Sequence, residues 1–292
     1  MIKLWSGAAL SLVLTACATL PADALPFGES FTAATPEDVH PVWQNITGGI
    51  DAAAFTIESP RLEAWALRID LTHPAVEIAV NAGNAHSGVV SSLKVDSFLH
   101  KYDCFAALNG GPFAPVSARE GELRLISGIF IADYTPVAPP APRYDALVFY
   151  RNGRGAVVRQ RDLVQNTANI RHAIGGFFTV LAGGTVSAAP ERTARHPRSA
   201  AGLSAGGKTL YLLAIDGRRR GSKGATEFET GLILSALGAV DGINLDGGGS
   251  TALAVRRKNG TAVIVNKPSH GLLRKGSRAV ATCIGIRIVP GQ

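Results

Sequence analysis

Residues 244–250, NLDGGGS, interrupt an apolar strand with a carboxylate and three consecutive glycines. Glycine weakens a strand because it loses much backbone entropy on ordering and offers no side chain to pack. At the carboxyl end of a strand, however, glycines let a ligand approach the backbone, and their N–H groups can form an anion-binding nest. Asn244 and Asp246 are two residues apart on a strand and therefore point to the same side. We predict a polar substrate-binding site formed by Asn244, Asp246, Gly247, Gly248, Gly249 and Ser250.

A second glycine-rich strand end follows the apolar run FAAL and consists of Asn109, Gly110 and Gly111. A single Gly-Gly at such a place is explained by a bulge or by a tight turn that packs a helix closely. Two such ends, each with Asn or Asp before the glycines, favour a shared binding site instead. The chain has neither G-x-x-x-x-G-K-[ST] nor G-x-G-x-x-G within a βαβ unit, so we expect neither an NTPase nor a dinucleotide-dependent enzyme.

A helix and a strand precede each glycine-rich end. Residues 91–103 predict a helix that runs into the strand ending at Asn109. Thr226 and Glu229 form a T-x-x-E capping box for a second helix, which Gly238 ends. The next strand leads into NLDGGGS, so two similar helix–strand units position the two polar ends.

Turn signals between apolar runs predict three hairpins. An Asn-Gly turn lies within residues 145–158, a Gly-Gly turn lies within 198–217, and THPA separates the strands 62–71 and 76–82. The chain shows no repeat of fixed period. We therefore predict an α+β fold, a single domain with a mixed, largely antiparallel β-sheet core and at least two helices packed on it.

The N-terminus has the pattern of an export signal. One lysine precedes an apolar stretch that is too short to span a bilayer. The stretch ends in LTAC, which resembles a bacterial lipobox and implies lipidation of Cys17 and a lipoprotein of the outer membrane facing the periplasm. An ordinary signal peptide, cleaved nearby, is the alternative. We expect a signal peptide over 1–17, a tether over 18–45 and the folded catalytic domain over 46–292.

The basic composition favours an anionic ligand. The formal net charge is +7, and the basic residues gather in RTARHPR, DGRRRGSK and RRK. Aromatic residues do not alternate with them, so we expect no nucleic acid but an anionic lipid, polysaccharide or phosphate ester as the ligand, with membrane contact through the lipid anchor. No loop has EF-hand spacing and no Cys-x-x-Cys occurs, so we predict no metal and no cofactor. Cys104 and Cys283 either form a disulfide or are separate core residues.

Four stretches in the same order carry a resemblance to a known family. They are FAALNGGPF, HPRSAAGLSAGGKTLYLLAIDGR, GATEFETGLILSALGAVDGINLDGGGSTALAV and VNKPS. Together they resemble the phosphodiester glycosidase family over residues 60–289. The resemblance implies hydrolysis of a sugar-1-phosphodiester at the anomeric carbon, with release of the sugar and a phosphomonoester.

The resemblance also implies roles for the motif residues. Asn109, Gly110 and Gly111 would line the site, Arg198 and Asp216 would lie at neighbouring strand ends, and Asp246 with its glycines would form the centre. A phosphate monoester is a good leaving group, so charge stabilisation by Arg198 and a carboxylate facing the anomeric carbon can suffice. We predict that Asp246 is the base or nucleophile and that Asp216 is the second carboxylate.

Simpler explanations exist for several of these residues. Asp216 could be a turn residue, and Arg198 could pair structurally with an acidic neighbour. Ser91 begins an S-x-x-K match typical of penicillin-binding enzymes, but the companion motifs are absent and we interpret Ser91 as a helix cap. His172 and His196 are general-acid candidates, although a lone histidine is more often structural. A non-catalytic envelope lipoprotein that binds an anionic glycan is the alternative function.

Overall fold

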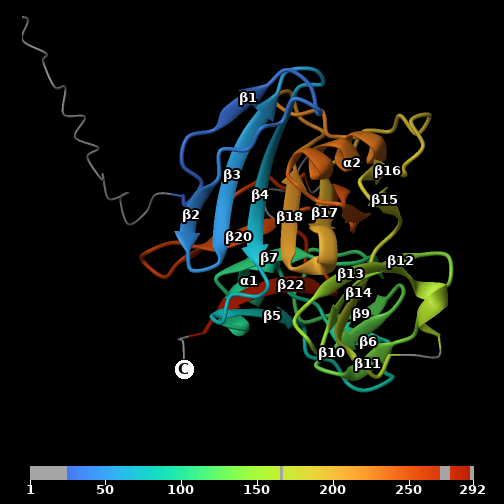
Figure 1. Ribbon diagram of the computed structural model, residues 1–292. Coiled ribbons are helices and arrows are strands. Elements are labelled where there is room, and N and C mark those ends of the chain that lie inside the picture. The colour runs from blue at the N-terminus through green and yellow to red at the C-terminus, as the bar shows by residue number, and fades with distance from the viewer. Residues whose placement is uncertain (1–24, 165–166, 270–276, 290–292) are drawn as a thin grey trace, which may run out of the picture.

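Strands are the main secondary structure in the computed structural model, which describes residues 25–164, 167–269 and 277–289 (Figure 1). The largest sheet contains nine strands: β1 (Phe31–Ala33), β2 (Gln44–Thr47), β3 (Ile50–Ile57), β4 (Leu62–Asp70), β15 (Thr179–Ala182), β16 (Thr185–Val186), β17 (Arg198–Leu203), β18 (Thr209–Ile215) and β19 (Asp241–Asn244). Their order is β1-β3-β4-β18-β17-β19-β15-β16, and β2 also pairs with β3. Within this sheet β1 and β3 are parallel, and the other pairs are antiparallel.

Two five-stranded sheets lie below the large sheet in Figure 1. One contains β5 (Val76–Val80), β7 (Ala106–Asn109), β20 (Leu253–Arg256), β21 (Ala262–Ile264) and β22 (Cys283–Ile288), in the order β21-β20-β7-β22-β5. The other contains β10 (Phe130–Ala132), β11 (Thr135–Ala138), β12 (Asp145–Tyr150), β13 (Gly155–Arg159) and β14 (Ile170–Gly175), in the order β11-β10-β14-β12-β13. A small sheet is formed by β6 (Val89–Ser91), β8 (Phe113–Ala114) and β9 (Leu123–Ile126).

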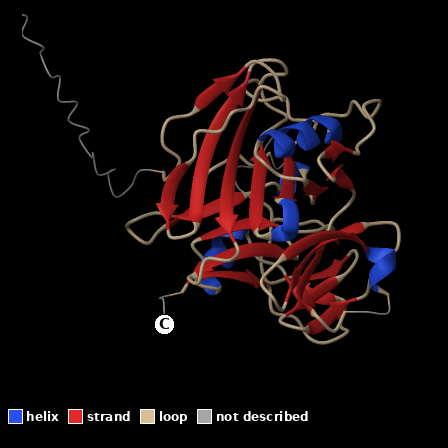
Figure 2. Cartoon of the chain, in the orientation of Figure 1, coloured by secondary structure: helices blue, strands red, loops and turns tan. Residues whose placement is uncertain are grey.

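The predicted α+β class with a single core sheet is wrong, because the chain is 43% strand and 11% helix and forms several sheets (Figure 2). The two α-helices, α1 (Val95–Lys101) and α2 (Glu227–Ala236), each cover only part of one sheet. The sheets bury their apolar faces largely against one another. One core cluster joins Ile50 of the nine-stranded sheet to Leu108 and Leu147 of the two five-stranded sheets. The fold is therefore β-rich, with packed sheets in place of a helix-covered sheet.

Two of the three predicted hairpins are confirmed. β12 pairs with β13 around the Asn-Gly turn, and β17 pairs with β18 around Gly206 and Gly207. The third is wrong, because β4 pairs with β3 and β18 whereas β5 pairs with β22 in a different sheet. The THPA turn therefore links two sheets, a distinction that local apolar patterns do not carry.

Both predicted helices are present. The Thr226 hydroxyl accepts a hydrogen bond from the backbone N–H of Glu229, and the Glu229 carboxylate accepts one from the N–H of Thr226, which completes the capping box. Gly238 follows the helix with φ +105°, as predicted for a stop. The interpretation of Ser91 as a cap is wrong, because Ser91 ends β6 and α1 starts after Lys94.

The N-terminal predictions lie mostly outside the described residues. These include the signal peptide over 1–17 with Cys17 and the first part of the 18–45 segment. From residue 25 onward that segment includes β1, and Phe27 and Val39 are buried. Cys104 and Cys283 are both free and buried, so they are separate core residues. Burial raises the pKa of the Cys104 thiol to about 12, which keeps it protonated and inert.

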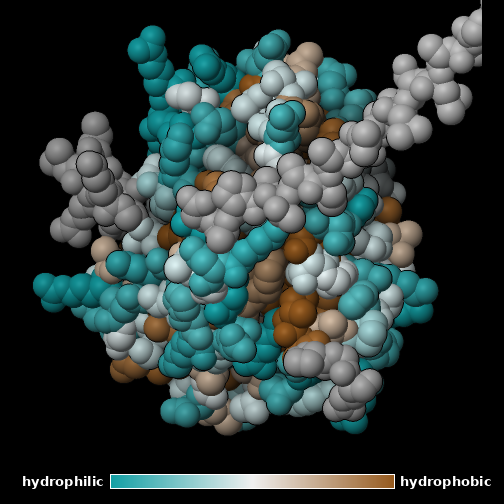
Figure 3. All heavy atoms as spheres, turned by 90° about the vertical axis from the view of Figure 1, so that its left-hand side faces the viewer, coloured by the Kyte–Doolittle hydropathy of each residue, from teal (hydrophilic) through white to brown (hydrophobic). Residues whose placement is uncertain are grey.

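The surface over β1, β2 and β3 is mainly hydrophilic. Figure 3 views this side and shows hydrophobic side chains gathered near the middle of the face. Across residues 25–164, 167–269 and 277–289, no helix has the length and apolar character needed to span a bilayer. The apolar side chains instead collect in cores between the sheets.

Candidate active site

The NLDGGGS stretch carries the chain from one sheet to another. β19 ends at Asn244, one turn of 3-10 helix covers Gly248–Ser250, and β20 begins at Leu253 beside β7. β7 ends at Asn109, so the two glycine-rich strand ends meet. The backbone N–H of Asp246 donates to the carbonyl of Gly110 at 3.0 Å. The strand therefore stops where the chain must change sheets.

Asn109 fastens these two ends together from inside the protein. Its Nδ2 donates to the carbonyl of Asp246 at 2.6 Å. Its Oδ1 accepts from the Ser199 hydroxyl at 2.6 Å and from the Ala252 backbone N–H at 3.1 Å. The side chain is fully buried. Asn109 therefore positions the glycine turn, and it does not line the cavity described below.

The glycines serve two different purposes. A Cβ at Gly111 would overlap the carbonyl oxygen of Gly175, and one at Gly110 would lie 2.5 Å from the Thr282 hydroxyl. These two glycines therefore permit close packing, which is the structural explanation that the sequence left open. Gly248 has φ +63° and borders the cavity described below, where a side chain would meet a neighbouring guanidinium.

Asp216 lies beneath the segment that follows the glycines. It is 1% exposed, and its carboxylate accepts hydrogen bonds from Arg219, from Asn266 Nδ2 at 3.1 Å and from the Lys267 backbone N–H at 3.0 Å. Asn266 in turn donates to the carbonyl of Thr251 and accepts from the N–H of Leu253. Burial raises the pKa of Asp216, while the Arg219 ion pair lowers it. Asp216 therefore acts as a brace, a residue whose hydrogen bonds hold the neighbouring segment in place, and it does not line a cavity with Asp246.

A cavity of about 360 Å³ opens in front of the glycine turn, a volume within the range of ligand pockets, about 300–1,000 Å³. Of the residues predicted from sequence, it brings together Arg198, Asn244, Asp246, Gly247 and Gly248. Its other lining residues are Phe177, Phe178, His196, Pro197, Arg218 and Glu227. Gly249 and Ser250 are buried within the turn and do not line the cavity. The cavity therefore combines two carboxylates, two guanidinium groups, an imidazole and two aromatic rings.

Asp246 is a carboxylate with a raised pKa in this cavity. Burial raises the pKa to about 6, against the opposing effects of the Ser250 hydroxyl, the positive charge of Arg278 and the N–H of Gly247. Arg278 Nη1 also donates to the Ser250 hydroxyl at 3.1 Å. A carboxylate that titrates near pH 6 is ionised at neutral pH and remains basic enough to accept a proton or attack carbon.

Arg198 is held rigidly at the other side of the cavity. It begins β17, and its Nε and Nη2 donate to the carbonyls of Ala225 at 2.9 Å and Ala194 at 3.2 Å. Its Nη1 lies 3.7 Å from Glu227 Oε1. Burial lowers the pKa of Arg198, but a guanidinium stays charged at neutral pH. Both sequence interpretations of Arg198 therefore apply, because it borders the cavity and also contacts an acidic neighbour.

The sequence patterns did not single out Glu227 or Arg218 as site residues. Glu227 is the first residue of α2, next to the capping box, and its Oε2 accepts from Arg192 Nη1 at 3.1 Å. An acidic residue in a first helical turn is ordinary, so it gives no functional signal. Arg218 belongs to the basic cluster DGRRRGSK, where the sequence did not separate it from its neighbours. The stronger signal was its place directly after Asp216-Gly217 at a strand end.

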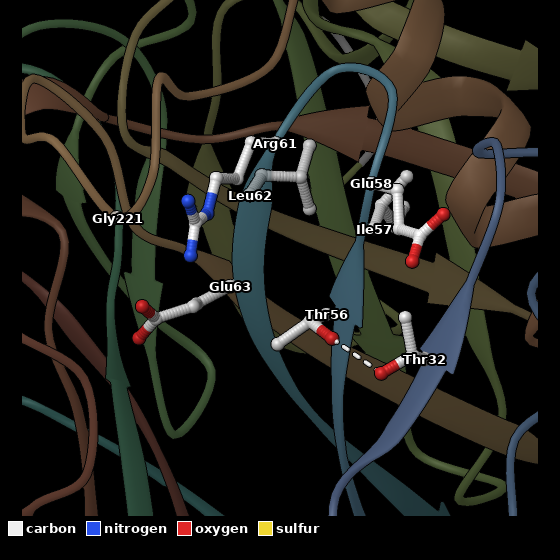
Figure 4. A pocket seen from close by; sticks show the side chains of 8 residues that line it. All are labelled: Thr32, Thr56, Ile57, Glu58, Arg61, Leu62, Glu63 and Gly221. Carbon is white, nitrogen blue, oxygen red and sulfur yellow. Dashed lines mark hydrogen bonds between the residues drawn. The ribbon is translucent and has the colours of Figure 1, made fainter.

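His172, a general-acid candidate from the sequence, borders a separate cavity of about 230 Å³ and does not line the cavity that holds Asp246. Two further cavities of the described residues contain none of the predicted site residues. One of about 420 Å³ lies at the ends of β1, β3 and β4, where Thr32 and Thr56 share a hydrogen bond of 2.9 Å (Figure 4). Glu63, which also lines this cavity, pairs with Arg219. Another of about 630 Å³ shares Phe178 with the candidate site. Within the described ranges, no group of three or more His, Cys, Asp or Glu is arranged to hold a metal ion.

The chain is similar to proteins of known sequence and structure. Over 247 residues the chain is 27% identical to the SPbeta prophage-derived uncharacterized protein YomE of Bacillus subtilis, a match that covers 79% of this chain and 36% of that protein. The chain thus spans about a third of the length of this relative.

Solved structures show the same fold at low sequence identity. The catalytic domain of zebrafish N-acetylglucosamine-1-phosphodiester alpha-N-acetylglucosaminidase is 20% identical with a TM-score of 0.62, covering 87% of this chain and 86% of that one. A hypothetical protein from Synechocystis is 14% identical with a TM-score of 0.60, covering 82% and 62%. A putative exported protein from Burkholderia pseudomallei is 15% identical with a TM-score of 0.56, covering 78% and 74%.

The family match covers the whole candidate site. Residues 102–287 match the phosphodiester glycosidase family, a range that includes Asn109, the cavity and the VNKPS motif. This range is more than half of the chain, and it spans the motifs on which the sequence resemblance rests. The chain therefore belongs to the phosphodiester glycosidase family.

Proposed function

We propose that the protein hydrolyses sugar-1-phosphodiesters at the anomeric carbon and releases the sugar and a phosphomonoester. Family membership supports glycosidase chemistry on such substrates. The observation that carries the proposal is the composition of one cavity. It combines Asp246, whose pKa is about 6, with a second carboxylate from Glu227 and the guanidinium groups of Arg198 and Arg218. This is the set of groups that cleavage beside a phosphate requires.

The guanidinium groups and Asp246 act on opposite ends of the scissile bond. When the bond from the anomeric carbon to the phosphate oxygen breaks, the electron pair leaves with the phosphate. Fixed guanidinium groups stabilise that charge, so a strong general acid is not needed. Positive charge develops on the sugar ring, and an ionised Asp246 stabilises it by attacking the anomeric carbon or by activating water.

Glu227 is the second carboxylate in our proposal, in the role for which the sequence favoured Asp216. Glu227 lines the cavity with Asp246, whereas all the hydrogen bonds of Asp216 are internal. We assign Asp216 a positioning role, because it holds Asn266 and the backbone of Lys267 behind the glycine turn. Asn109 has the same role on the other side of the turn.

We further propose that the protein acts in the cell envelope as a lipoprotein anchored through Cys17. The support is the N-terminal sequence alone, an apolar stretch ending in LTAC. Lipid labelling in cells tests this: incorporation of a labelled fatty acid that is lost in Cys17→Ala supports it. Export without labelling would favour an ordinary signal peptide.

Turnover by the purified chain over residues 18–292 tests the proposed activity. UDP-N-acetylglucosamine and a panel of sugar-1-phosphodiesters serve as substrates, and sugar release is measured. We expect Asp246→Asn to lower kcat/KM at least about a hundredfold, with Asp103→Asn, an exposed carboxylate, as the matched control. Absence of release from every substrate, with glycan binding retained, would instead favour a non-catalytic glycan-binding lipoprotein.

A further inference from the structure

Arg218 holds a backbone conformation that costs free energy. Its φ is +59°, in the left-handed region that non-glycine residues rarely adopt. Strain of this kind persists where the surrounding structure enforces it, and it clusters at binding and catalytic sites. The contacts of the Arg218 side chain indicate what this conformation provides.

The Arg218 side chain lies across the glycine turn. Its Nη2 is 3.1 Å from Nδ1 of His196. Its Nη2 and Nη1 also lie 3.2 Å and 3.3 Å from the point where a Cβ at Gly248 would be. Gly248 therefore leaves the space that the guanidinium occupies. Among the residues that the structure describes, no carboxylate forms an ion pair with Arg218.

His196 is suited to hold this guanidinium. A guanidinium has only donors, so Nδ1 must be the acceptor and the ring proton must be on Nε2. Burial and the charges of Arg198 and Arg218 lower the pKa of His196, while Glu227 raises it, so the ring is neutral at neutral pH. The backbone of His196 is fixed by hydrogen bonds in both directions with Ala225, at 3.2 Å and 3.0 Å.

We propose that His196 is a positioning residue that holds Arg218 over the glycine turn, where Arg218 binds the phosphate of the substrate. The inference rests on the proposed function and adds to it the residue that recognises the phosphate. Arg198 donates two hydrogen bonds to backbone carbonyls, so fewer of its N–H groups are available to a ligand. Arg218 is exposed and donates one hydrogen bond, to His196. Its planar guanidinium keeps further donors for a bidentate contact with phosphate oxygens.

A pair of substitutions at His196 separates positioning from general packing. In His196→Asn, the amide oxygen can occupy the place of Nδ1 and still accept from Arg218. In His196→Gln, the amide lies near the place of Nε2, so this acceptor is lost. We expect His196→Gln and Arg218→Gln each to raise KM about tenfold, the effect of losing a hydrogen bond to a charged group. Each should also lower kcat, because the same guanidinium stabilises the charge that develops on the leaving phosphate. His196→Asn should keep KM within about threefold of the parent chain.

The double variant and a binding assay complete the test. If His196 acts through Arg218, His196→Gln combined with Arg218→Gln should raise KM no more than Arg218→Gln alone. Affinity for inorganic phosphate, measured by calorimetry, should follow the same pattern without any turnover. Unchanged phosphate affinity and KM in Arg218→Gln would overturn the inference. Because Arg218 is exposed, this variant should fold, so it tests the inference even if His196→Gln unfolds. Phosphate binding that follows the pattern in a chain without turnover would retain the inference and reject the proposed function.

Discussion

Asp246→Asn should make the protein inactive and, above pH 6, more stable. The partly buried Asp246 carboxylate has a pKa of about 6, whereas an unfolded aspartate has its ordinary value of 3.8. The first cause of the difference is burial, which disfavours the charged form. The Ser250 hydroxyl and Arg278 offset only part of it. The ionised carboxylate therefore destabilises the native state that uses it.

The sign and size of the effect follow from proton linkage. Below pH 3.8 both states bind the proton, and the group does not affect the free energy of unfolding. Between 3.8 and about 6 the unfolded state releases its proton while the folded state keeps it, so stability falls as pH rises. Above about 6 both states are ionised, and the folded state has lost about 3 kcal/mol. The neutral amide introduced by Asp246→Asn avoids this loss.

Urea unfolding of Asp246→Asn and the parent chain at pH 4 and pH 8 measures the prediction. The variant should gain up to about 3 kcal/mol at pH 8 and much less at pH 4. Asp103→Asn is the matched control, because the Asp103 side chain is 93% exposed and its removal should change stability little at either pH. A variant that is less stable than the parent at pH 8 would refute the reasoning, since it would mean that the folded state stabilises the carboxylate.

Three further predictions concern the surroundings of the turn. Asn109→Ala leaves the Asp246 carbonyl and two buried donors without partners, so it should lower the free energy of unfolding by about 3–5 kcal/mol, measured by urea unfolding. Arg278→Gln removes a charge that lowers the pKa of Asp246; kcat/KM should rise with pH through about 6 in the parent chain, and this limb should move to higher pH in the variant. Gly111→Ala would drive a methyl group into the Gly175 carbonyl, so soluble expression with a cooperative thermal transition should be lost.

Matched controls exist for each of these substitutions. Asn169→Ala changes an exposed asparagine, and Arg220→Gln changes an exposed arginine that does not border the cavity. Gly183→Ala adds a methyl group where nothing lies within 4 Å, so it carries only the strain of a positive φ, about 1 kcal/mol. If Asn109→Ala were as stable as Asn169→Ala, the hydrogen bonds of Asn109 would not be holding the turn. If the pH dependence of kcat/KM were the same in Arg278→Gln as in the parent chain, the prediction for Arg278 would be wrong. If Gly111→Ala were soluble with a cooperative thermal transition, the prediction for Gly111 would be wrong.

The local elements were predictable where a short stretch contains all of its own information. The capping box of Thr226 and Glu229, the stop at Gly238 and the hairpins after β12 and β17 formed as expected. Each depends on hydrogen bonds or turn geometry among residues close in sequence. The THPA turn contains no such information about partners, and it joins strands of two different sheets.

The sequence predicted Asp246 and its glycine turn, but it did not predict all of the residues that surround Asp246 in the cavity. Carboxylates and glycines at strand ends pointed to Asp246 and its turn, and Asp246 borders the cavity. The same signal also selected Asn109 and Asp216, which lie behind the turn as braces. A brace and a ligand-contacting residue have the same residue types at the same strand ends. Only the direction of the side chain in the folded protein separates them.

The sequence by itself determined the motifs, the two helices and the meeting of polar residues with glycines at strand ends, because these features depend on near neighbours along the chain. The tertiary structure decided that several sheets pack together and that the glycine turn crosses between two of them. It also decided that Glu227, His196 and Arg218 join Asp246 in one cavity. The physical reason is that pairing between distant strands, and the direction in which a side chain points, depend on contacts across the whole core.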